Sequence, residues 1–370
     1  MQPGSRDPSG RADEWLDRRV VPAALELPSN AEYLAHLDLA TGSHARLIRL
    51  AANENTELPS PRVRAALERA YADANLSPPT MPALRLELAR RHGADANQVL
   101  LSAGSTEVID AIFRTFVREG DEVVLPRPTW PVFRRRLQVL EATVVEVPLL
   151  VDETTWSHDV DGLLAAVTER TKLVVVCTPN NPTGNAMHPS DLRRVADLGV
   201  PLLVDGAYAD FDAGVDFTAI LHEHDNAIVT RTFSKAYCLA GLRVGYAIGT
   251  ARMIDYVDRF LVPGSSVSSA ALHAGLAALE DEPYHRAQVT RIVAERDRLL
   301  DGLRAAGVRA FDSRGNFVAI DASDAPGGAR GLAAAFFEQG IVVRPLMDEL
   351  VRITVGRAWE NDAVLTAARG

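Results

Sequence analysis

Lysine is scarce in this sequence, and one of its two lysines lies in an unusual setting. The chain has 39 basic residues, of which only Lys172 and Lys235 are lysines. Lys172 follows the polar run TERT, which is typical of a solvated flank. Lys235 lies among small and apolar residues in RTFSKAYCLAGLRVGY, directly after an apolar run. Because an amine in apolar surroundings has a lowered pKa, Lys235 is the candidate for a Schiff base with a carbonyl compound.

A glycine and two hydroxyl side chains meet at the predicted start of a helix in SAGSTEVID. Gly104, Ser105 and Thr106 follow an apolar run, so backbone N–H groups and hydroxyls would face one point. Helix N-termini of this kind bind anions, most economically a phosphate. The alternative is that Ser105 or Thr106 only caps the helix. Arg243 could add a fixed charge to the same phosphate.

Two other polar segments directly follow apolar runs. The first, CTPNNPTG at residues 177–184, has a composition that turn chemistry alone can explain. The second is LVDGAY, in which Asp205 ends the apolar run and Tyr208 follows three residues later. A carboxylate in this position is either a helix cap or a buried charge that needs a partner. A protonated ring nitrogen would be a suitable partner.

The elements that must position these residues form an alternating pattern. Between about residues 85 and 250, short apolar runs alternate with helical patterns, which predicts βαβ units and a mainly parallel sheet covered on both faces. Such sheets bind ligands at the carboxyl ends of their strands, where the polar segments fall. The predicted strands cover residues 98–102, 121–126, 143–149, 172–179, 201–208, 226–234 and 243–249.

After about residue 260 the pattern changes to a smaller α+β unit. Helical patterns cover residues 268–281 and 283–307, and short apolar runs follow. The second of these helices is long and charged, and we expect it to join the two units.

Composition excludes several classes of partner. A net charge of -10 argues against nucleic acid or an anionic membrane surface. No run approaches the roughly 18 apolar residues of a membrane span, and the N-terminus has no apolar stretch typical of a signal peptide. Only Cys177 and Cys238 are cysteines, so no disulfide framework is implied and we expect a cytoplasmic protein.

Together, an imine-forming lysine, a phosphate cradle and a buried aspartate fit one cofactor, pyridoxal 5'-phosphate (PLP). The ordered motifs RLAANEN, GDEVVLPRPTWPVF, TPNNPTG, DGAY, SKAYCLAGLRVGY and VRITVG closely resemble fold-type I PLP enzymes of the class I/II aminotransferase family, especially the histidinol-phosphate aminotransferase branch. The resemblance implies an α/β fold with a seven-stranded, mainly parallel sheet in a large domain. It also implies a PLP-binding domain over residues 49–260, a small α+β domain over 261–370 and an N-terminal arm over 1–48 that covers the active site.

The same resemblance implies roles residue by residue. Lys235 would form the Schiff base and move the proton at the substrate Cα, Asp205 would pair with the pyridine nitrogen, and Arg352 would clamp the substrate α-carboxylate. Asn53 and Asn181 would lie at the substrate. The other cofactor contacts would be Trp130 on the ring, Asn181 and Tyr208 at the ring hydroxyl, and Gly104, Ser105, Thr106, Thr232 and Arg243 at the phosphate. Family members are usually homodimers with shared sites, so we expect a homodimer here.

Two positions depart from the family pattern. Histidinol-phosphate aminotransferases carry an Arg-Tyr-Pro run whose tyrosine crosses the dimer to the substrate phosphate, whereas ANLSPPTMP places Leu76 there. We therefore expect a substrate other than histidinol phosphate. The usual Asp-Glu-Ala-Tyr is Asp-Gly-Ala-Tyr in this chain, with Gly206 in place of the glutamate.

The N-terminal arm carries a second resemblance, to PLP-dependent arginine oxidases and hydroxylases. It rests on Ser29, on Glu32 three residues later and on the run GSHAR with His44. The match implies that Glu32 binds a guanidinium, that His44 takes part in oxidation by dioxygen and that Ser29 is catalytic. The match is imperfect, because Ser43 is inserted and Thr41 stands where an acidic residue is usual.

Three functions on a free α-amino acid remain open. The arm favours an O2-dependent oxidase or hydroxylase of L-arginine or a close cationic relative. The alternative is a conventional aminotransferase for an aromatic or basic amino acid, because the oxidases carry an aspartate where this chain has Thr232, an aminotransferase feature. His44 would then be a surface or capping residue and Glu32 part of a solvated helical face. A PLP cyclase acting on hydroxylated arginine is the third possibility.

Overall fold

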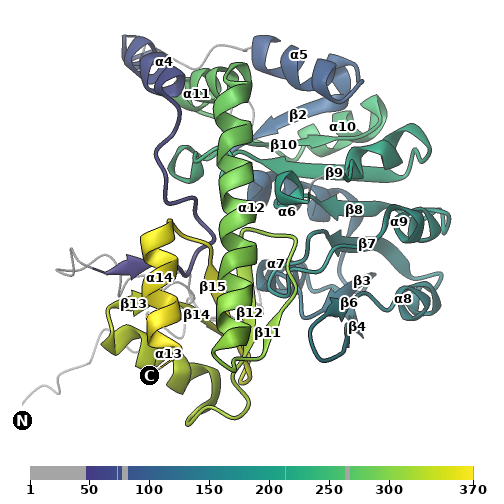
Figure 1. The fold of residues 1–370 in the computed structure, drawn as a ribbon. Helices are drawn as coiled ribbons and strands as arrows, with labels where there is room; N and C mark the ends of the chain where they lie inside the picture. The colour runs from purple at the N-terminus through teal and green to yellow at the C-terminus, as the bar shows by residue number, and fades with distance from the viewer. Residues whose placement is uncertain (1–46, 73, 77–81, 213, 263–266, 370) are drawn as a thin grey trace, which may run out of the picture.

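The computed structural model describes residues 47–369, except for residues 73, 77–81, 213 and 263–266. A seven-stranded sheet forms the larger part of the molecule (Figure 1). Its strands, in spatial order, are β2 (Val99–Ser102), β10 (Gly245–Ile248), β9 (Ala227–Thr232), β8 (Leu202–Asp205), β7 (Thr171–Cys177), β3 (Glu122–Arg127) and β4 (Thr143–Pro148). Only β10 runs antiparallel to its neighbours, so the predicted mainly parallel sheet is confirmed.

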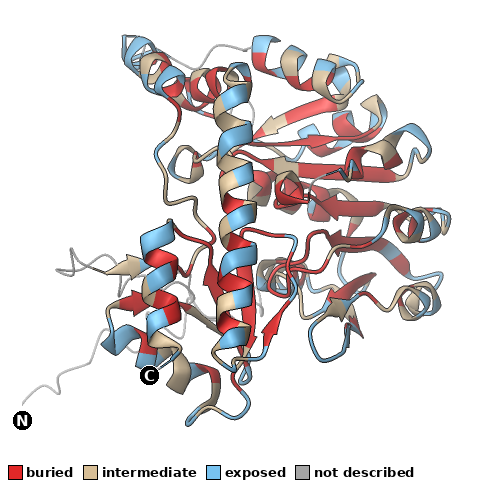
Figure 2. Ribbon diagram, viewed as in Figure 1, coloured by how far each residue is buried: buried red, intermediate tan, exposed pale blue. Residues whose placement is uncertain are grey.

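Helices cover both faces of this sheet, as its nearly continuous apolar strands require (Figure 2). Alternate residues point to opposite faces, so Leu203 packs on one side while Leu202 and Val204 pack on the other. One face is covered by α6 (Ser105–Phe116), α7 (Pro131–Val139) and α10 (Ala251–Asp258). The other is covered by α8 (Val160–Ala166), α9 (Pro189–Ala196) and the 3-10 helix η3 (Phe217–His222).

A third group of helices packs at the β2–β10 end of the sheet. It contains α4 (Pro61–Tyr71), α5 (Pro82–Arg91) and α11 (Ser269–Glu280), and α11 contacts both of the others. The short elements elsewhere are η1 (Ala96–Gln98), η2 (Ala209–Phe211), η4 (Ala240–Leu242) and the hairpin of β5 (Leu150–Val151) and β6 (Trp156–Ser157).

The predicted smaller α+β unit is present as an antiparallel sheet with two helices. Its strands, in spatial order, are β11 (Ala310–Phe311), β12 (Phe317–Asp321), β15 (Leu350–Thr354) and β14 (Arg344–Leu346), accompanied by α13 (Gly328–Glu338) and α14 (Ala358–Ala367). Next to this sheet, β1 (Ile48–Arg49) pairs in parallel with β13 (Ile341–Val342). Residues 48–49 therefore lie with the small unit, and the chain then enters the large unit.

The long helix α12 (Glu282–Ala305) runs past both units, as the sequence predicts (Figure 1). Its buried leucines belong to the core of the smaller unit, and its first half contacts α11. The domain boundaries near residues 48 and 260 stay predictions. Among the described residues, no helix is both long and apolar enough to cross a membrane.

Candidate active site

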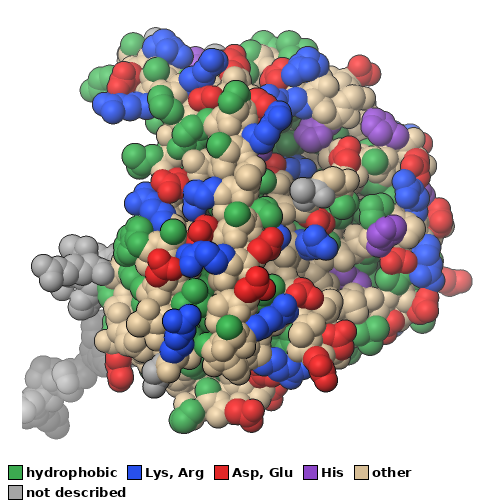
Figure 3. Space-filling model, in the orientation of Figure 1, with side chains coloured by type: hydrophobic (Ala, Val, Ile, Leu, Met, Phe, Trp, Pro, Cys, Tyr) green, Lys and Arg blue, Asp and Glu red, His purple; other side chains and the backbone are tan. Residues whose placement is uncertain are grey.

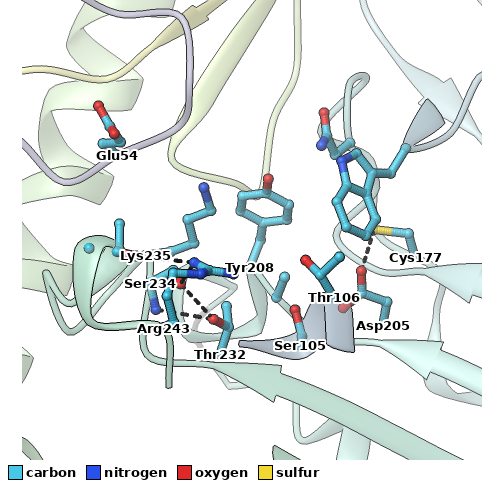
Figure 4. A pocket seen from close by; sticks show the side chains of 15 residues that line it. Glu54, Ser105, Thr106, Cys177, Asp205, Tyr208, Thr232, Ser234, Lys235 and Arg243 are labelled. Carbon is cyan, nitrogen blue, oxygen red and sulfur yellow. Dashed lines mark hydrogen bonds between the residues drawn. The ribbon is translucent and has the colours of Figure 1, made fainter. Parts of the chain in front are cut away.

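A cavity of about 320 Å³ lies at the carboxyl end of the parallel strands. Figure 4 shows its lining side chains, which come from distant parts of the chain, among them Glu54, Thr106, Asp205 and Arg243. The cavity brings together most of the residues that the sequence analysis singled out. Its lining is Glu54, Ser105, Thr106, Trp130, Cys177, Asn181, Asp205, Ala207, Tyr208, Thr232, Ser234, Lys235, Ala240, Gly241 and Arg243.

Lys235 enters the cavity from the turn after β9. Its Nζ donates a hydrogen bond to the carbonyl of Ala52 at 2.9 Å and lies 5.9 Å from the centre of the Tyr208 ring. Burial lowers the pKa of Lys235 to about 7, and the nearby Arg352 guanidinium acts in the same direction. A substantial fraction of this side chain is therefore a neutral amine near pH 7, which is the form that attacks a carbonyl carbon.

Asp205 is the last residue of β8 and is fully buried. Thr230 donates a hydrogen bond to its Oδ1 at 3.1 Å, and the Sγ of Cys177 lies 3.9 Å from its Oδ2. Burial raises the pKa of Asp205 to about 6, although these donors and Lys235 act against the rise. A buried carboxylate of this kind is stabilised by a cation, so it fits the protonated ring nitrogen of a pyridine.

One end of the cavity, formed by the start of α6 and by Arg243, has its shape because residue 104 is a glycine. We call it the phosphate end. Gly104 precedes α6 with φ 79°, and a Cβ atom built on it would overlap the Arg243 guanidinium. The absence of that atom lets Arg243 lie against the N-terminus of α6, beside Ser105 and Thr106. Backbone N–H groups, two hydroxyls and a guanidinium therefore face one small space, which fits a phosphate dianion.

Thr232 and Ser234 complete this end of the cavity. Thr232 Oγ1 and Ser234 Oγ are 2.9 Å apart, and Arg243 Nη1 donates to Ser234 Oγ at 3.3 Å (Figure 4). Ser234 was not among the predicted cofactor residues, although its position next to Lys235 was a signal for it. Thr232 was predicted to contact the phosphate, and the structure places it in the cavity beside Ser234.

Arg352 lies on β15 of the smaller sheet and contacts Asn181, which lines the cavity. One of its amino groups donates to Asn181 Oδ1 and the other to the carbonyl of Ala51 at 2.6 Å. Its guanidinium lies 5.6 Å from the centre of the Phe317 ring. These contacts hold the planar group in a fixed orientation beside Asn181, as a bidentate carboxylate clamp requires.

A short segment, residues 51–53, connects the smaller sheet to the cavity. The carbonyls of Ala51 and Ala52 accept hydrogen bonds from Arg352 and Lys235, and Asn53 Nδ2 donates to the hydroxyl of Tyr208 at 3.1 Å. The sequence analysis predicted Asn53 near the substrate, and the structure places it beside Tyr208. Its φ of 52° lies in the left-handed region, which asparagine adopts more readily than most residues.

Trp130 lines the cavity at the start of α7, where its ring packs edge-on against Phe133 with centroids 5.2 Å apart. Gly206 follows Asp205, and a Cβ atom there would lie 3.0 Å from Cδ of Arg231. Arg231 forms an ion pair with Asp210 at 2.9 Å. The glycine that departs from the family pattern therefore makes room for this largely buried arginine.

The predicted residues of the N-terminal arm, Ser29, Glu32 and His44, lie outside the described residues. Leu76 is described, and 61% of it is exposed, away from the cavity of its own chain.

A model of the family "Aminotransferase class I and II" matches residues 45–368. The chain belongs to the class I and II aminotransferase family. Among curated relatives of this aminotransferase, the histidinol-phosphate aminotransferase 2 of Caulobacter vibrioides is 37% identical and covers 95% of this chain and 96% of its own length. The aromatic amino acid aminotransferase of Rhodococcus opacus is 38% identical and covers 88% of this chain and 90% of its own length.

Solved structures agree with this assignment. The histidinol-phosphate aminotransferase of Sinorhizobium meliloti in complex with pyridoxal-5'-phosphate has a TM-score of 0.83 and 26% identity, and covers 95% of this aminotransferase and 96% of its own chain. The Thermus thermophilus aspartate aminotransferase with maleate has a TM-score of 0.80 and 26% identity, with 95% and 98% coverage. The fold is therefore that of fold-type I PLP enzymes, and the cofactor of this family member is PLP.

The residues at the cavity fit PLP, and each would have a separate role in its chemistry. When bound, the cofactor delocalises the electron pair released at the substrate Cα. Lys235 would hold it covalently and, as a free amine, move the proton at the substrate Cα. Asp205 would keep the ring nitrogen protonated, while Arg352 would orient the substrate through its carboxylate.

Proposed function

We propose that this enzyme is a conventional aminotransferase that moves the amino group of a free α-amino acid to a 2-oxo acid. Aromatic L-amino acids are the first donors to test. The observation that carries the proposal is the 38% identity, over 88% of the chain, to a relative named aromatic amino acid aminotransferase. Lys235 and Asp205 line one cavity, and Arg352 bonds Asn181 in the same lining. This arrangement supports the proposal, because transamination needs each of these groups.

An arginine oxidase, the function that the arm favoured, is less well supported. Each relative and solved structure reported above is named an aminotransferase. Thr232, where the oxidases carry an aspartate, lies at the phosphate end of the cavity and bonds Ser234. The aminotransferase alternative therefore explains the described site better.

Histidinol phosphate is a weaker candidate, although one relative carries that name. The residue at the predicted tyrosine position is Leu76, which has no hydroxyl for a substrate phosphate. An aromatic donor needs no such contact, because its side chain is uncharged. Basic donors stay open as a second class within the same proposal.

A single-turnover experiment tests the proposal. The holoenzyme is mixed with L-phenylalanine, L-tyrosine or L-tryptophan in the absence of an acceptor, and the absorbance of the cofactor is recorded. We expect conversion to the amine form of the cofactor, which 2-oxoglutarate or another 2-oxo acid then reverses, and parallel lines in steady-state plots. L-Arginine is tested in an oxygen electrode without any 2-oxo acid. Oxygen uptake above that of a Lys235→Ala variant, with no reversible conversion by aromatic donors, would overturn the proposal.

A homodimer is part of the same proposal. Large apolar side chains are exposed in and near α4, including Leu58 at 74% and Tyr71 at 82%. Side chains of this kind are stabilised when a second protein surface covers them. Light scattering on the purified holoenzyme should give twice the 40.0 kDa chain mass, and a monomer at micromolar concentration would contradict it.

A further inference from the structure

Asn53 is held by a hydroxyl that belongs to the opposite end of the chain. Thr354, the last residue of β15, is fully buried. The backbone N–H of Asn53 donates to Thr354 Oγ1 at 2.9 Å, and the same hydroxyl donates to Asn53 Oδ1 at 3.3 Å. Asn316 Nδ2 donates to the carbonyl of Asn53 at 3.0 Å. These contacts fix both the backbone and the side chain of Asn53.

The two bonds to Thr354 determine which end of the Asn53 amide faces Tyr208. A threonine hydroxyl has one proton, and because Thr354 Oγ1 already accepts an N–H, that proton is free to be donated to Asn53 Oδ1. The amide nitrogen of Asn53 therefore points at the Tyr208 hydroxyl, to which it donates at 3.1 Å. The opposite orientation would place Oδ1 there instead.

The orientation of this amide decides where the proton of Tyr208 goes. Because Asn53 Nδ2 donates to the Tyr208 oxygen, the Tyr208 proton is not needed for that contact and can be donated into the cavity. If Oδ1 faced Tyr208, it would take up the same proton. Burial raises the pKa of Tyr208 to about 12, so the hydroxyl keeps its proton across the neutral range.

Packing fixes the ring of Tyr208, so the direction of its O–H bond is the main feature that can vary. Its ring contacts Phe317 edge-on with centroids 5.1 Å apart, and both side chains are buried. The titratable and charged groups that face Tyr208 are Lys235, Arg352, Asp205 and Cys177. A change at Thr354 alters none of these groups directly.

We propose that Thr354 is a positioning residue that acts through Asn53 to keep the Tyr208 hydroxyl a hydrogen-bond donor to the ring hydroxyl oxygen of PLP. The inference goes beyond the proposed function, because it concerns the cofactor and holds for any amino donor. It requires only that PLP binds in the cavity with its ring hydroxyl near Tyr208. Its test therefore uses no substrate, and its failure would leave the aminotransferase proposal intact.

The test is a pH titration of the visible absorbance of the holoenzyme. The bound cofactor changes colour when it loses a proton, and its ring oxygen then carries a negative charge that the Tyr208 proton stabilises. Thr354→Val removes the hydroxyl with little change in shape and weakens that stabilisation. We expect the midpoint of the titration to rise by about one pH unit. Thr354→Ser keeps the hydroxyl and should leave the midpoint at the wild-type value.

Thr171→Val is the matched control. Thr171 is also buried and accepts a hydrogen bond from the backbone of Thr168, but it lies at the other end of β7 from the cavity. Its replacement should not move the midpoint. An unchanged midpoint in the PLP-loaded Thr354→Val protein, or an equal rise in Thr354→Ser, would overturn the proposal.

A second variant keeps the test decisive if Thr354→Val binds too little cofactor to titrate. Asn53→Asp has the same shape but replaces the amide nitrogen by an acceptor, which takes up the Tyr208 proton directly. The midpoint should then rise by at least as much as for Thr354→Val. A wild-type midpoint in Asn53→Asp would show that the direction of this hydrogen bond does not matter, and the proposal would fail.

Discussion

Two buried groups with opposite pKa shifts define the chemistry of the site at the scale of single residues. Burial lowers the pKa of Lys235 to about 7 and raises that of Asp205 to about 6, because removal from water disfavours the charged form of each. Lys235 thereby becomes a nucleophile near neutral pH, and Asp205 is left in need of a cation. Both shifts favour the binding of a cationic pyridine that carries an aldehyde.

The shift at Lys235 predicts how the apoenzyme takes up PLP. Only the neutral amine attacks the aldehyde, so the rate of covalent uptake should rise with pH and level off above about pH 7, more than three units below the 10.5 of an ordinary lysine. Stopped-flow absorbance at a fixed PLP concentration measures this rate. A rate that still rises steeply between pH 8 and pH 10 would contradict the lowered pKa.

The same shift predicts a pH dependence of apoenzyme stability. Between about pH 7 and pH 10.5 the unfolded chain binds a proton at Lys235 that the folded chain does not. The free energy of unfolding should therefore rise with pH across this window, and this gain is lost as the pH falls through it. Chemical denaturation at several pH values compares the wild type with Lys235→Met. The variant should show a shallower rise, and identical slopes would show that Lys235 titrates normally in the folded chain.

At the scale of elements, the phosphate site depends on the turn between β2 and α6. Gly104→Ala should weaken PLP affinity at least tenfold, because the added Cβ displaces the Arg243 guanidinium from the helix N-terminus. Gly120→Ala is the control, since Gly120 has nearly the same φ, 78°, and an added Cβ would have nothing within 4 Å. Equilibrium titration of each apoenzyme with PLP gives the affinity. Equal losses in the two variants would mean that backbone strain, rather than the position of Arg243, causes the effect.

The alternation of apolar runs and helical patterns was sufficient to predict the elements that carry the cofactor residues. Asp205 and Lys235 lie at the ends of apolar runs, and the predicted strands at 201–208 and 226–234 contain β8 and β9. The antiparallel direction of β10 was not predictable, because a short apolar run has the same pattern in either direction.

Contacts between distant segments were also beyond the sequence. Asn53 and Thr354 lie 301 residues apart, and no local pattern marks them as partners. Cys177 is buried, and its Sγ lies beside the carboxylate of Asp205, a contact that its sequence neighbours do not indicate. Such pairs follow from the packing of whole elements rather than from the preferences of neighbouring residues.

At the scale of the whole molecule, the site joins the two sheets, because residues that follow strands of the large sheet line the cavity and Arg352 of the small sheet bonds Asn181 in that lining. Lys235 and Asp205 follow strands of the large sheet, whereas Arg352 and Thr354 belong to the small one, and the segment at residues 51–53 contacts both. The hairpin β5–β6 adds a second connection, in which Arg309 donates to the carbonyl of Asp152 at 2.8 Å. A ligand in the cavity should therefore stabilise the molecule as a unit.

Removal of the cofactor tests this coupling. When the PLP concentration is several hundred times its dissociation constant, binding stabilises the folded chain by roughly 3 to 4 kcal/mol. The melting temperature of the apoenzyme should therefore be about 5 °C or more below that of the holoenzyme. Lys235→Ala should lose most of this difference, and Lys172→Ala, which changes an exposed lysine, should keep it. Equal melting temperatures for the wild-type apoenzyme and holoenzyme would contradict the coupling.

The central claim is that Lys235 carries PLP in this enzyme. Borohydride reduction of the holoenzyme, followed by proteolysis and peptide mass mapping, tests it directly, because the chain has only one other lysine. We predict a reduced phosphopyridoxyl group on the peptide that contains Lys235 and none on the peptide that contains Lys172. A label on Lys172 alone, or no label on either peptide, would contradict the account.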